Sequence, residues 1–254
     1  MIYDIQKASM WKRLSAYLLD TILLCVTAVG LALLLSTVLG YDARTAERND
    51  LRTKYETEFG VDFDIAQDDY NKLPDSEKKK IDDAYTAFAT DPEVNRLDVL
   101  IINLSLIIAV FGILGAFLIF EFIIPLKFKN GQTLGKKVFG VGVMRVDGVK
   151  LSVFQLFVRT ILGKYTLETM LPAMLILLLV FNIMPVACLA GIAIILITQI
   201  IFVLFSQLHT PIHDAIAGTV TVDFASQMIF ETPEALLEYK KRIHAEAAER
   251  AEYR

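Results

Sequence analysis

The chain has 254 residues, of which 55% are hydrophobic, and its formal net charge is -4. Soluble domains are about 45–50% apolar. The apolar excess here lies in long runs, which indicates an integral membrane protein. The sequence has no haem or zinc motif, no nucleotide-binding loop and no nucleophile motif such as GxSxG. We therefore expect no enzyme, no cofactor and no nucleic-acid partner.

The first apolar run covers about residues 14–39. It is too long for the hydrophobic part of a cleaved signal peptide, which is about 7–15 residues. We predict an N-terminal segment and first transmembrane helix over 1–40. Cys25 in this run, like Cys188 in a later one, is interpreted as a small buried hydrophobic side chain.

Asp20 lies inside the first apolar run, where a carboxylate is costly and needs a partner or a function. Arg13 shares its helix face but is about 10 Å away along the helix axis, so no direct salt bridge forms between them. The candidate partners are Arg159, Lys164 and Arg13 of a second copy. Asp20 is either part of a buried ion pair that fixes the first span, or a protonatable site where protons and cations compete.

An insert at 41–97 separates the first span from a second one at 98–124. Residues 41–96 carry fifteen acidic and nine basic side chains. Helices are predicted from Asp42 to Phe59, from Pro74 to Ala89, and from Asp91 continuously into the second span. The insert is either a platform for a ligand or partner, or a solvated helical cap. Its acids lack the spacing of a calcium-binding loop.

Segment 125–164 carries eight basic side chains against one acid. Alternating apolar residues around Asp147-Gly148 predict a β-hairpin of 138–146 with 149–153. The apolar stripe of 152–163 is typical of an interfacial helix. The loop from Gly131 to Gly135 lacks the spacing of a phosphate-binding loop, so we expect its basic flank to meet anionic lipid headgroups.

A transmembrane hairpin is predicted over 165–206, with its turn at Asn182 and Pro185. Glu168 and Pro172 weaken the first arm, which could instead be a re-entrant segment. Two acids, Glu121 and Glu168, lie at the inner ends of spans as anchors or relay carboxylates.

The tail, 207–254, contains His213 and Asp214, then a predicted third strand over 219–224 and a charged helix from Thr232-Pro233. His213 could titrate near neutral pH. With His209 the pair has no established metal-ligand spacing, so we expect no metal.

The charges of the loops predict the orientation. Lys and Arg mark cytoplasmic segments, and basic segments at 1–13 and 125–164 flank the acidic insert. We therefore expect both termini in the cytoplasm, the insert outside, and an all-α polytopic protein of about four transmembrane helices with a small cytoplasmic β-hairpin and an interfacial helix.

These polar positions together resemble those of the RDD family of membrane proteins, which is named for one arginine and two aspartates. Arg13, Asp20 and Asp214 correspond to these three residues. The other similar positions are Gly131, Gln132, Thr133, Gly135, Arg145, Asp147, Gly148, Arg159, Gly218 and Thr219. The resemblance covers about 8–38 and 100–225. It implies a bacterial or archaeal plasma membrane protein, and cation/proton antiport is associated with some members.

We therefore expect an inner-membrane protein of transport type that exchanges a monovalent cation for protons at Asp20. Arg13, Arg159 and Asp214 would be its ion-pair or gating partners, and Glu121, Glu168 and His213 secondary candidates. Four spans are few for a transport path, so we consider a homodimer. The alternative is a membrane scaffold that binds lipids or a partner.

Overall fold

The computed structural model describes residues 5–128, 131–180, 184–206 and 208–252. It is mostly helical, with a two-stranded antiparallel sheet. Four helices are long and apolar enough to cross a membrane: Met10–Leu39, Pro92–Phe128, Val153–Val180 and Pro185–Phe205. This confirms the predicted class of a multi-pass helical membrane protein with four candidate spans. The chain forms two compact units, one of residues 1–27 and 114–254 and the other of residues 28–113.

The smaller unit contains the predicted helical insert. After α1 (Met10–Leu39), Gly40 with φ of 69° allows the turn into α2 (Tyr41–Phe59), and α3 (Gln67–Lys72) and α4 (Asp75–Thr90) follow. Asp91 caps α5 (Pro92–Phe117) because its Oδ1 accepts the backbone N–H of Glu93 at 2.7 Å. The helix then continues into the second span, as predicted.

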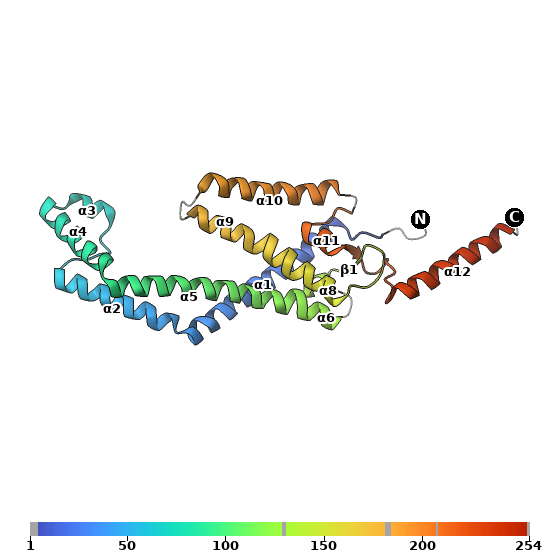
Figure 1. Cartoon of the computed structure of the whole chain (residues 1–254), viewed down its shortest axis with the longest axis horizontal. Coiled ribbons are helices and arrows are strands. Elements are labelled where there is room, and N and C mark those ends of the chain that lie inside the picture. Colours follow the sequence, from blue (N-terminus) through green and yellow to red (C-terminus); the bar gives the residue numbers. More distant parts are fainter. Residues whose placement is uncertain (1–4, 129–130, 181–183, 207, 253–254) are drawn as a thin grey trace. The chain divides into compact units, whose positions relative to one another are not determined.

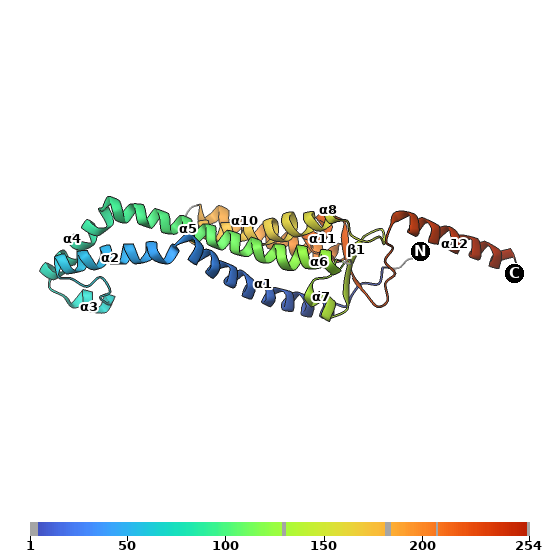
Figure 2. The same cartoon turned by 90° about the horizontal axis from the view of Figure 1, so that it is seen from below.

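A small apolar core holds the insert together. Helices α2 and α4 pack side by side (Figure 2). Four apolar side chains are buried: Ala84, Phe88, Val94 and Leu97. Further along the same unit, α5 approaches α1 closely at Gly112, where an added Cβ would lie 3.2 Å from the carbonyl oxygen of Ala28. The insert is therefore a packed helical element, and its surface charges are mostly solvated.

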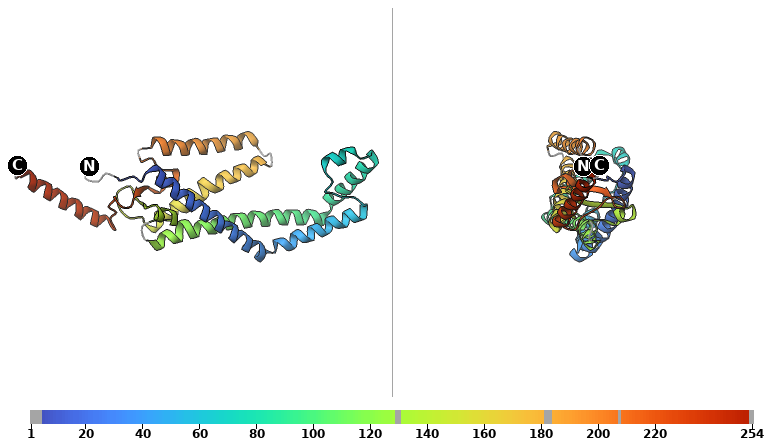
Figure 3. Two further views of the ribbon diagram at one scale, coloured as in Figure 1. Left: turned by 180° about the vertical axis from the view of Figure 1, so that it is seen from behind. Right: turned by 90° about the vertical axis from the view of Figure 1, so that its right-hand side faces the viewer.

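In the larger unit, the second and third spans each contain a π-helical segment. The second span runs from α5 through Leu118–Ile123 into α6 (Ile124–Phe128). The third runs from α8 (Val153–Phe157) through Val158–Met170 into α9 (Leu171–Val180). π-Helical turns are frequent at functional sites, and these two bring the acids and bases of the two spans together. In Figures 1 and 3, α9 lies beside α10 (Pro185–Phe205), as their contacts require.

The third span differs from its prediction. We predicted an interfacial helix over 152–163, separate from the transmembrane hairpin that starts at 165, but Val153–Val180 is one continuous helix. Ser152 begins it with a capping box, in which its hydroxyl accepts the Gln155 N–H. Glu168, which weakened the predicted span, is paired with His213, and Lys164 at the predicted boundary is paired with Glu121. The predicted turn residue Asn182 lies outside the described residues.

The sheet also pairs differently from the prediction. The turn at Asp147-Gly148 forms, with the Gly148 N–H donating to the Arg145 carbonyl at 3.0 Å. However, β1 (Val141–Arg145) pairs with β2 (Thr219–Asp223) and not with 149–153. The hairpin prediction was wrong because Ser152 already begins a helix, so 149–153 is too short to form a strand.

Three short or terminal helices complete the larger unit: α7 (Leu134–Val138), α11 (Ile212–Ala217) and α12 (Pro233–Glu252). The predicted helix start at Thr232 is confirmed, since its Oγ1 accepts the Ala235 N–H at 3.2 Å. One prediction for the cysteines was wrong. Cys188 is buried, but Cys25 is exposed on the surface of α1, where an apolar side chain would face lipid.

Candidate functional site

Asp20 is held by the loop that begins at Gly131, and not by a basic side chain. Its carboxylate is 6% exposed. The Thr133 hydroxyl donates a short hydrogen bond to Oδ2, and the Gly135 backbone N–H donates to Oδ1 at 2.7 Å. Arg159 and Lys164, our predicted partners, pair with other carboxylates. The predicted pairing was wrong because two neutral donors of one loop satisfy both oxygens of Asp20.

The sequence of this loop explains how it approaches α1 so closely. A Cβ on Gly135 would lie 2.4 Å from the Ala16 carbonyl oxygen, so only glycine fits there. Gly131 has φ of 67°, which glycine adopts without strain. Gln132 donates from Nε2 to the Val141 carbonyl at 2.8 Å and ties the loop to β1. The Gly-Gln-Thr-Leu-Gly motif therefore forms a loop that binds the Asp20 carboxylate.

Glu121 connects the second and third spans. Lys164 Nζ lies 2.5 Å from Glu121 Oε1, and Arg159 Nη1 lies 4.0 Å from Oε2. The Thr160 hydroxyl donates to the backbone carbonyl of Glu121 at 2.8 Å. Neither Glu121 Oε2 nor Arg159 Nη1 has a hydrogen-bond partner among the described residues.

Lys136 is a buried base that the sequence analysis did not single out. Lys136 is 8% exposed and lies on the short helix α7, next to the loop residues that bind Asp20. Burial and the nearby charges of Lys164 and Arg159 lower the pKa of Lys136 to about 7, while Glu121 and Asp20 oppose that change. Its charge therefore changes near neutral pH. Its position directly after the glycine motif was the only available signal.

Arg159 and Asp214 form the most deeply buried ion pair of the larger unit. Both side chains are 1% exposed, and Arg159 Nε lies 2.6 Å from Asp214 Oδ1. The Thr219 and Thr221 hydroxyls donate to Asp214 at 2.6 and 3.1 Å. Burial alone would raise the pKa of Asp214, but Arg159 holds it below its usual range. Gly218, with φ of 64°, ends α11 so that Thr219 can reach back to Asp214.

His213 and Glu168 are in contact at the other side of Arg159. His213 Nδ1 lies 2.8 Å from Glu168 Oε2 and 2.9 Å from Oε1. Glu168 also accepts the His213 backbone N–H at 3.1 Å and Gln199 Nε2 at 3.2 Å. Close packing fixes the histidine, because a Cβ on Gly163 would lie 2.5 Å from the His213 Cβ.

Arg13, the remaining family residue, lies at the start of α1 away from this cluster. Its Nη1 donates to the His209 carbonyl at 3.1 Å, while its Nε is buried without a partner among the described residues. His209 has φ of 51°, which is uncommon for a residue other than glycine. Arg13 therefore stabilises the turn that follows the fourth span.

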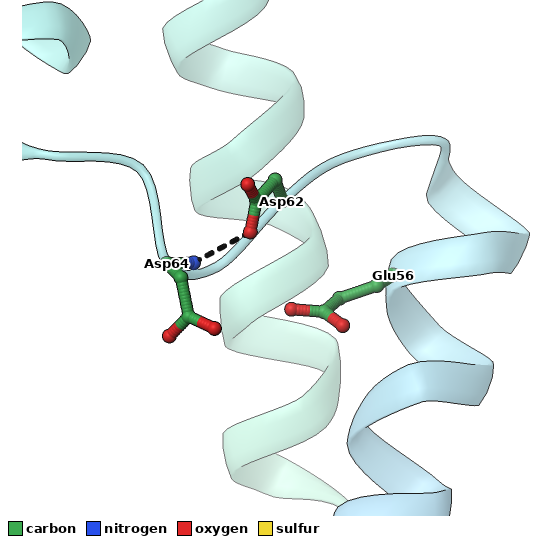
Figure 4. Close-up of side chains that lie close together, drawn as sticks. All are labelled: Glu56, Asp62 and Asp64. Carbon is green, nitrogen blue, oxygen red and sulfur yellow. Dashed lines mark hydrogen bonds between the residues drawn. The ribbon is translucent and has the colours of Figure 1, made fainter.

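Three carboxylates of the insert also lie together: Glu56, Asp62 and Asp64 (Figure 4). Arg52 lies 3.1 Å from Glu56 and 2.6 Å from Asp64. The backbone N–H of Asp64 donates to Asp62 Oδ1 at 2.8 Å. The Arg52 guanidinium pairs with two of the three carboxylates, and these contacts are those of a surface ion pair.

The RDD family profile matches residues 7–218, which is most of the chain. The chain belongs to the RDD family. The comparisons with curated proteins and with solved structures gave no match. The residues that name the family separate in this RDD protein into three local contacts: Asp20 with the glycine loop, Asp214 with Arg159, and Arg13 with the His209 carbonyl.

Proposed function

We propose that this RDD family protein is a transport protein that exchanges a monovalent cation for protons. The supporting observation is the charge of the buried cluster in the larger unit. It has eight ionisable groups: Asp20, Glu121, Lys136, Arg159, Lys164, Glu168, His213 and Asp214. Four carboxylates face three basic side chains, so with Lys136 protonated and His213 neutral the described cluster has one negative charge in excess.

An excess charge in a poorly solvated region is unfavourable until a counter-charge binds. A proton or a monovalent cation neutralises it equally well, and the two therefore compete. Asp214 has Arg159 as its partner, Glu121 has Lys164, and the charge of Lys136 acts on Asp20, so the excess charge falls beside the pair of Glu168 and neutral His213. The Glu168 side chain is 20% exposed, so it is accessible for exchange.

The contacts favour a positioning role for Asp20, whose two oxygens already accept strong donors. In this proposal Asp20 and Asp214 hold the loop and α11 in place, and Glu168 takes over the exchange role first expected for Asp20. The proposal places the protein in a plasma membrane with both termini in the cytoplasm, with anionic lipids at its basic segment. A homodimer would supply more helices to line a transport path than the four spans of one chain.

Purified protein in liposomes with an imposed pH gradient tests the exchange. A lumenal pH dye is followed while Na⁺, K⁺ or Li⁺ is added to wild type, Glu168→Gln and Asp20→Asn. Glu238→Gln is the matched control, because Glu238 is exposed on α12. We expect cation-dependent proton movement by wild type and Glu238→Gln and none by Glu168→Gln. Asp20→Asn should chiefly lower the melting temperature.

Two outcomes would count against the proposal. If folded wild type moves no protons with any of the three cations, the exchange proposal fails and the scaffold interpretation remains. Exchange that persists in folded Glu168→Gln but disappears in folded Asp20→Asn would return the exchange role to Asp20.

A further inference from the structure

We infer that His213 is the residue of the buried cluster that binds the exchanged proton, and that Arg159 positions it by selecting one tautomer of the neutral ring. The inference rests on the proposed exchange and names the proton-binding atom, His213 Nε2. It is carried by the arrangement of three side chains around one imidazole: Glu168, Arg159 and Asp214.

The neighbours of the imidazole determine which nitrogen carries hydrogen. Arg159 Nη2 lies 3.3 Å from His213 Nε2. A guanidinium only donates hydrogen bonds, so Nε2 must be the acceptor and carry no hydrogen. Glu168 only accepts while it is ionised, so Nδ1 must be the donor. The contacts on both sides therefore agree on a neutral ring with its hydrogen on Nδ1.

A proton can be added only at Nε2, the nitrogen that faces Arg159. An N–H at that position cannot keep the contact with the guanidinium, and like charges would then face each other at about 3 Å. Asp214 Oδ2 lies 3.7 Å from the same nitrogen and is the available acceptor. Proton binding therefore turns Nε2 from Arg159 towards Asp214, and it neutralises the one excess negative charge of the described cluster.

Every charged group packed against the imidazole contributes to its affinity for a proton. Glu168, Arg159 and Lys164 face it from the third span, and Asp214 lies on its own helix. Burial is the largest effect and lowers the pKa of His213; Arg159 and Lys164 act in the same direction, and Asp214 and Glu168 oppose it. The His213 ring is thus neutral at pH 7.

Arg159 extends the effect of the proton to the second span. Its Nε stays with Asp214 at 2.6 Å, while its Nη1 lies 4.0 Å from Glu121 Oε2, which has no hydrogen-bond partner in the described part of the chain. A guanidinium repelled by protonated His213 can close this gap. The proton at His213 and the contact between the second and third spans are therefore coupled.

Nitrogen-15 NMR of histidine-labelled protein tests the assignment directly. The chain has three histidines, so His213→Gln identifies the signal of interest and His244→Gln, on the exposed α12, is the matched control. We expect His213 at pH 8 to show hydrogen on Nδ1 and to gain a second hydrogen as the pH falls. In the liposome assay, His213→Gln should reduce exchange at least about tenfold, and His244→Gln should not.

Addition of Na⁺, K⁺ or Li⁺ should move the titration of His213 to lower pH if proton and cation compete. A ring with hydrogen on Nε2 at pH 8, or a titration that no cation shifts in protein active in exchange, would overturn the inference. If wild type shows no exchange at all, the proposed function fails, while the tautomer measurement still decides the role of Arg159. The tautomer and the titration are measured on wild type, and if His213→Gln fails to fold, His209→Gln and His244→Gln assign the His213 signal by elimination.

Discussion

At the scale of single residues, the two carboxylates Asp20 and Glu168 have different surroundings. Asp20 has a hydroxyl and a backbone N–H, one on each oxygen, and neither donor carries a charge that could change. Glu168 contacts a histidine ring that can gain a proton as the pH falls. Asp20 is easier to recognise in the sequence because it interrupts an apolar run. Its contacts nevertheless suit Asp20 to hold the glycine loop in place. The contact with His213 suits Glu168 to respond to protons.

The first prediction concerns the hydroxyl of Thr133. Thr133→Val removes the donor to Asp20 Oδ2 and leaves a buried carboxylate oxygen unsatisfied. We expect a loss of about 1–3 kcal/mol of stability, measured as a lower melting temperature in detergent. Thr133→Ser should melt close to wild type. Thr198→Val is a control, since the Thr198 hydroxyl bonds only its own helix at the Ile194 carbonyl. A Thr133→Val protein that melts like wild type would contradict the assigned partner of Asp20.

The second prediction concerns the charge of Lys136. Its pKa is lowered from 10.5 to about 7, first by burial and then by Lys164 and Arg159. Between these two pH values the unfolded chain holds a proton that the folded chain does not, so stability rises with pH across this window. Below pH 7 both states are protonated and the cost of the buried charge is complete. Lys136→Met removes that cost, which is on the order of a few kcal/mol.

Melting curves at pH 6 and pH 9 measure the effect. We expect Lys136→Met to melt above wild type at pH 6 and by a smaller margin at pH 9. Lys137→Met, on the same short helix but exposed, should show no such dependence on pH. If Lys136→Met is the less stable protein at pH 6, the ammonium is required as a counter-charge for Glu121 and Asp20.

At the scale of elements, the sequence predicted helices better than contacts. The helices of the insert and α12 were predicted because charge patterns and local caps such as Asp91 and Thr232 define them. The partner of β1 was not, because 73 residues separate Arg145 from Thr219 and no local pattern selects that pairing. The break predicted before 165 was wrong for a related reason. Lys164 and Glu168 are charged, but each has a partner from another part of the chain, Glu121 and His213, so the helix continues through both.

The third prediction concerns the contact between α1 and α7. Gly135→Ala places a Cβ 2.4 Å from the Ala16 carbonyl oxygen and 2.9 Å from Asp20 Cγ. The loop must then move away from α1, and the expected loss is about 1–3 kcal/mol. Gly30→Ala is the matched control, because nothing lies within 4 Å of that position and alanine favours a helix. Membrane abundance and melting temperature of the two variants check this. Equal behaviour of the two would show that α7 does not touch α1.

At the scale of the whole molecule, the sequence predicted the membrane class and four spans because length and hydropathy alone define them. It could not predict the buried cluster, since its groups come from five separate parts of the chain. The cluster exists because the third span carries Arg159, Lys164 and Glu168 within the larger unit. Each of these would be unfavourable alone in lipid and is compatible with a span only through its partner.

The fourth prediction concerns the orientation of the chain. If all four candidate spans cross, both termini lie on one side and the insert on the other, and from the basic segments we expect the termini in the cytoplasm. A cysteine at exposed Ser76 of α4 should react with a membrane-impermeant maleimide added to intact cells. A cysteine at exposed Ala245 of α12 should react only after the cells are opened.

Wild type is the control, because its Cys25 and Cys188 both lie within spans and should stay unlabelled. Labelling of Ala245→Cys in intact cells would invert the orientation. Labelling of both positions in intact cells would mean an even number of crossings between them, so one of the three spans that separate them does not cross. The third span, with its buried charges, would then be the segment that does not cross.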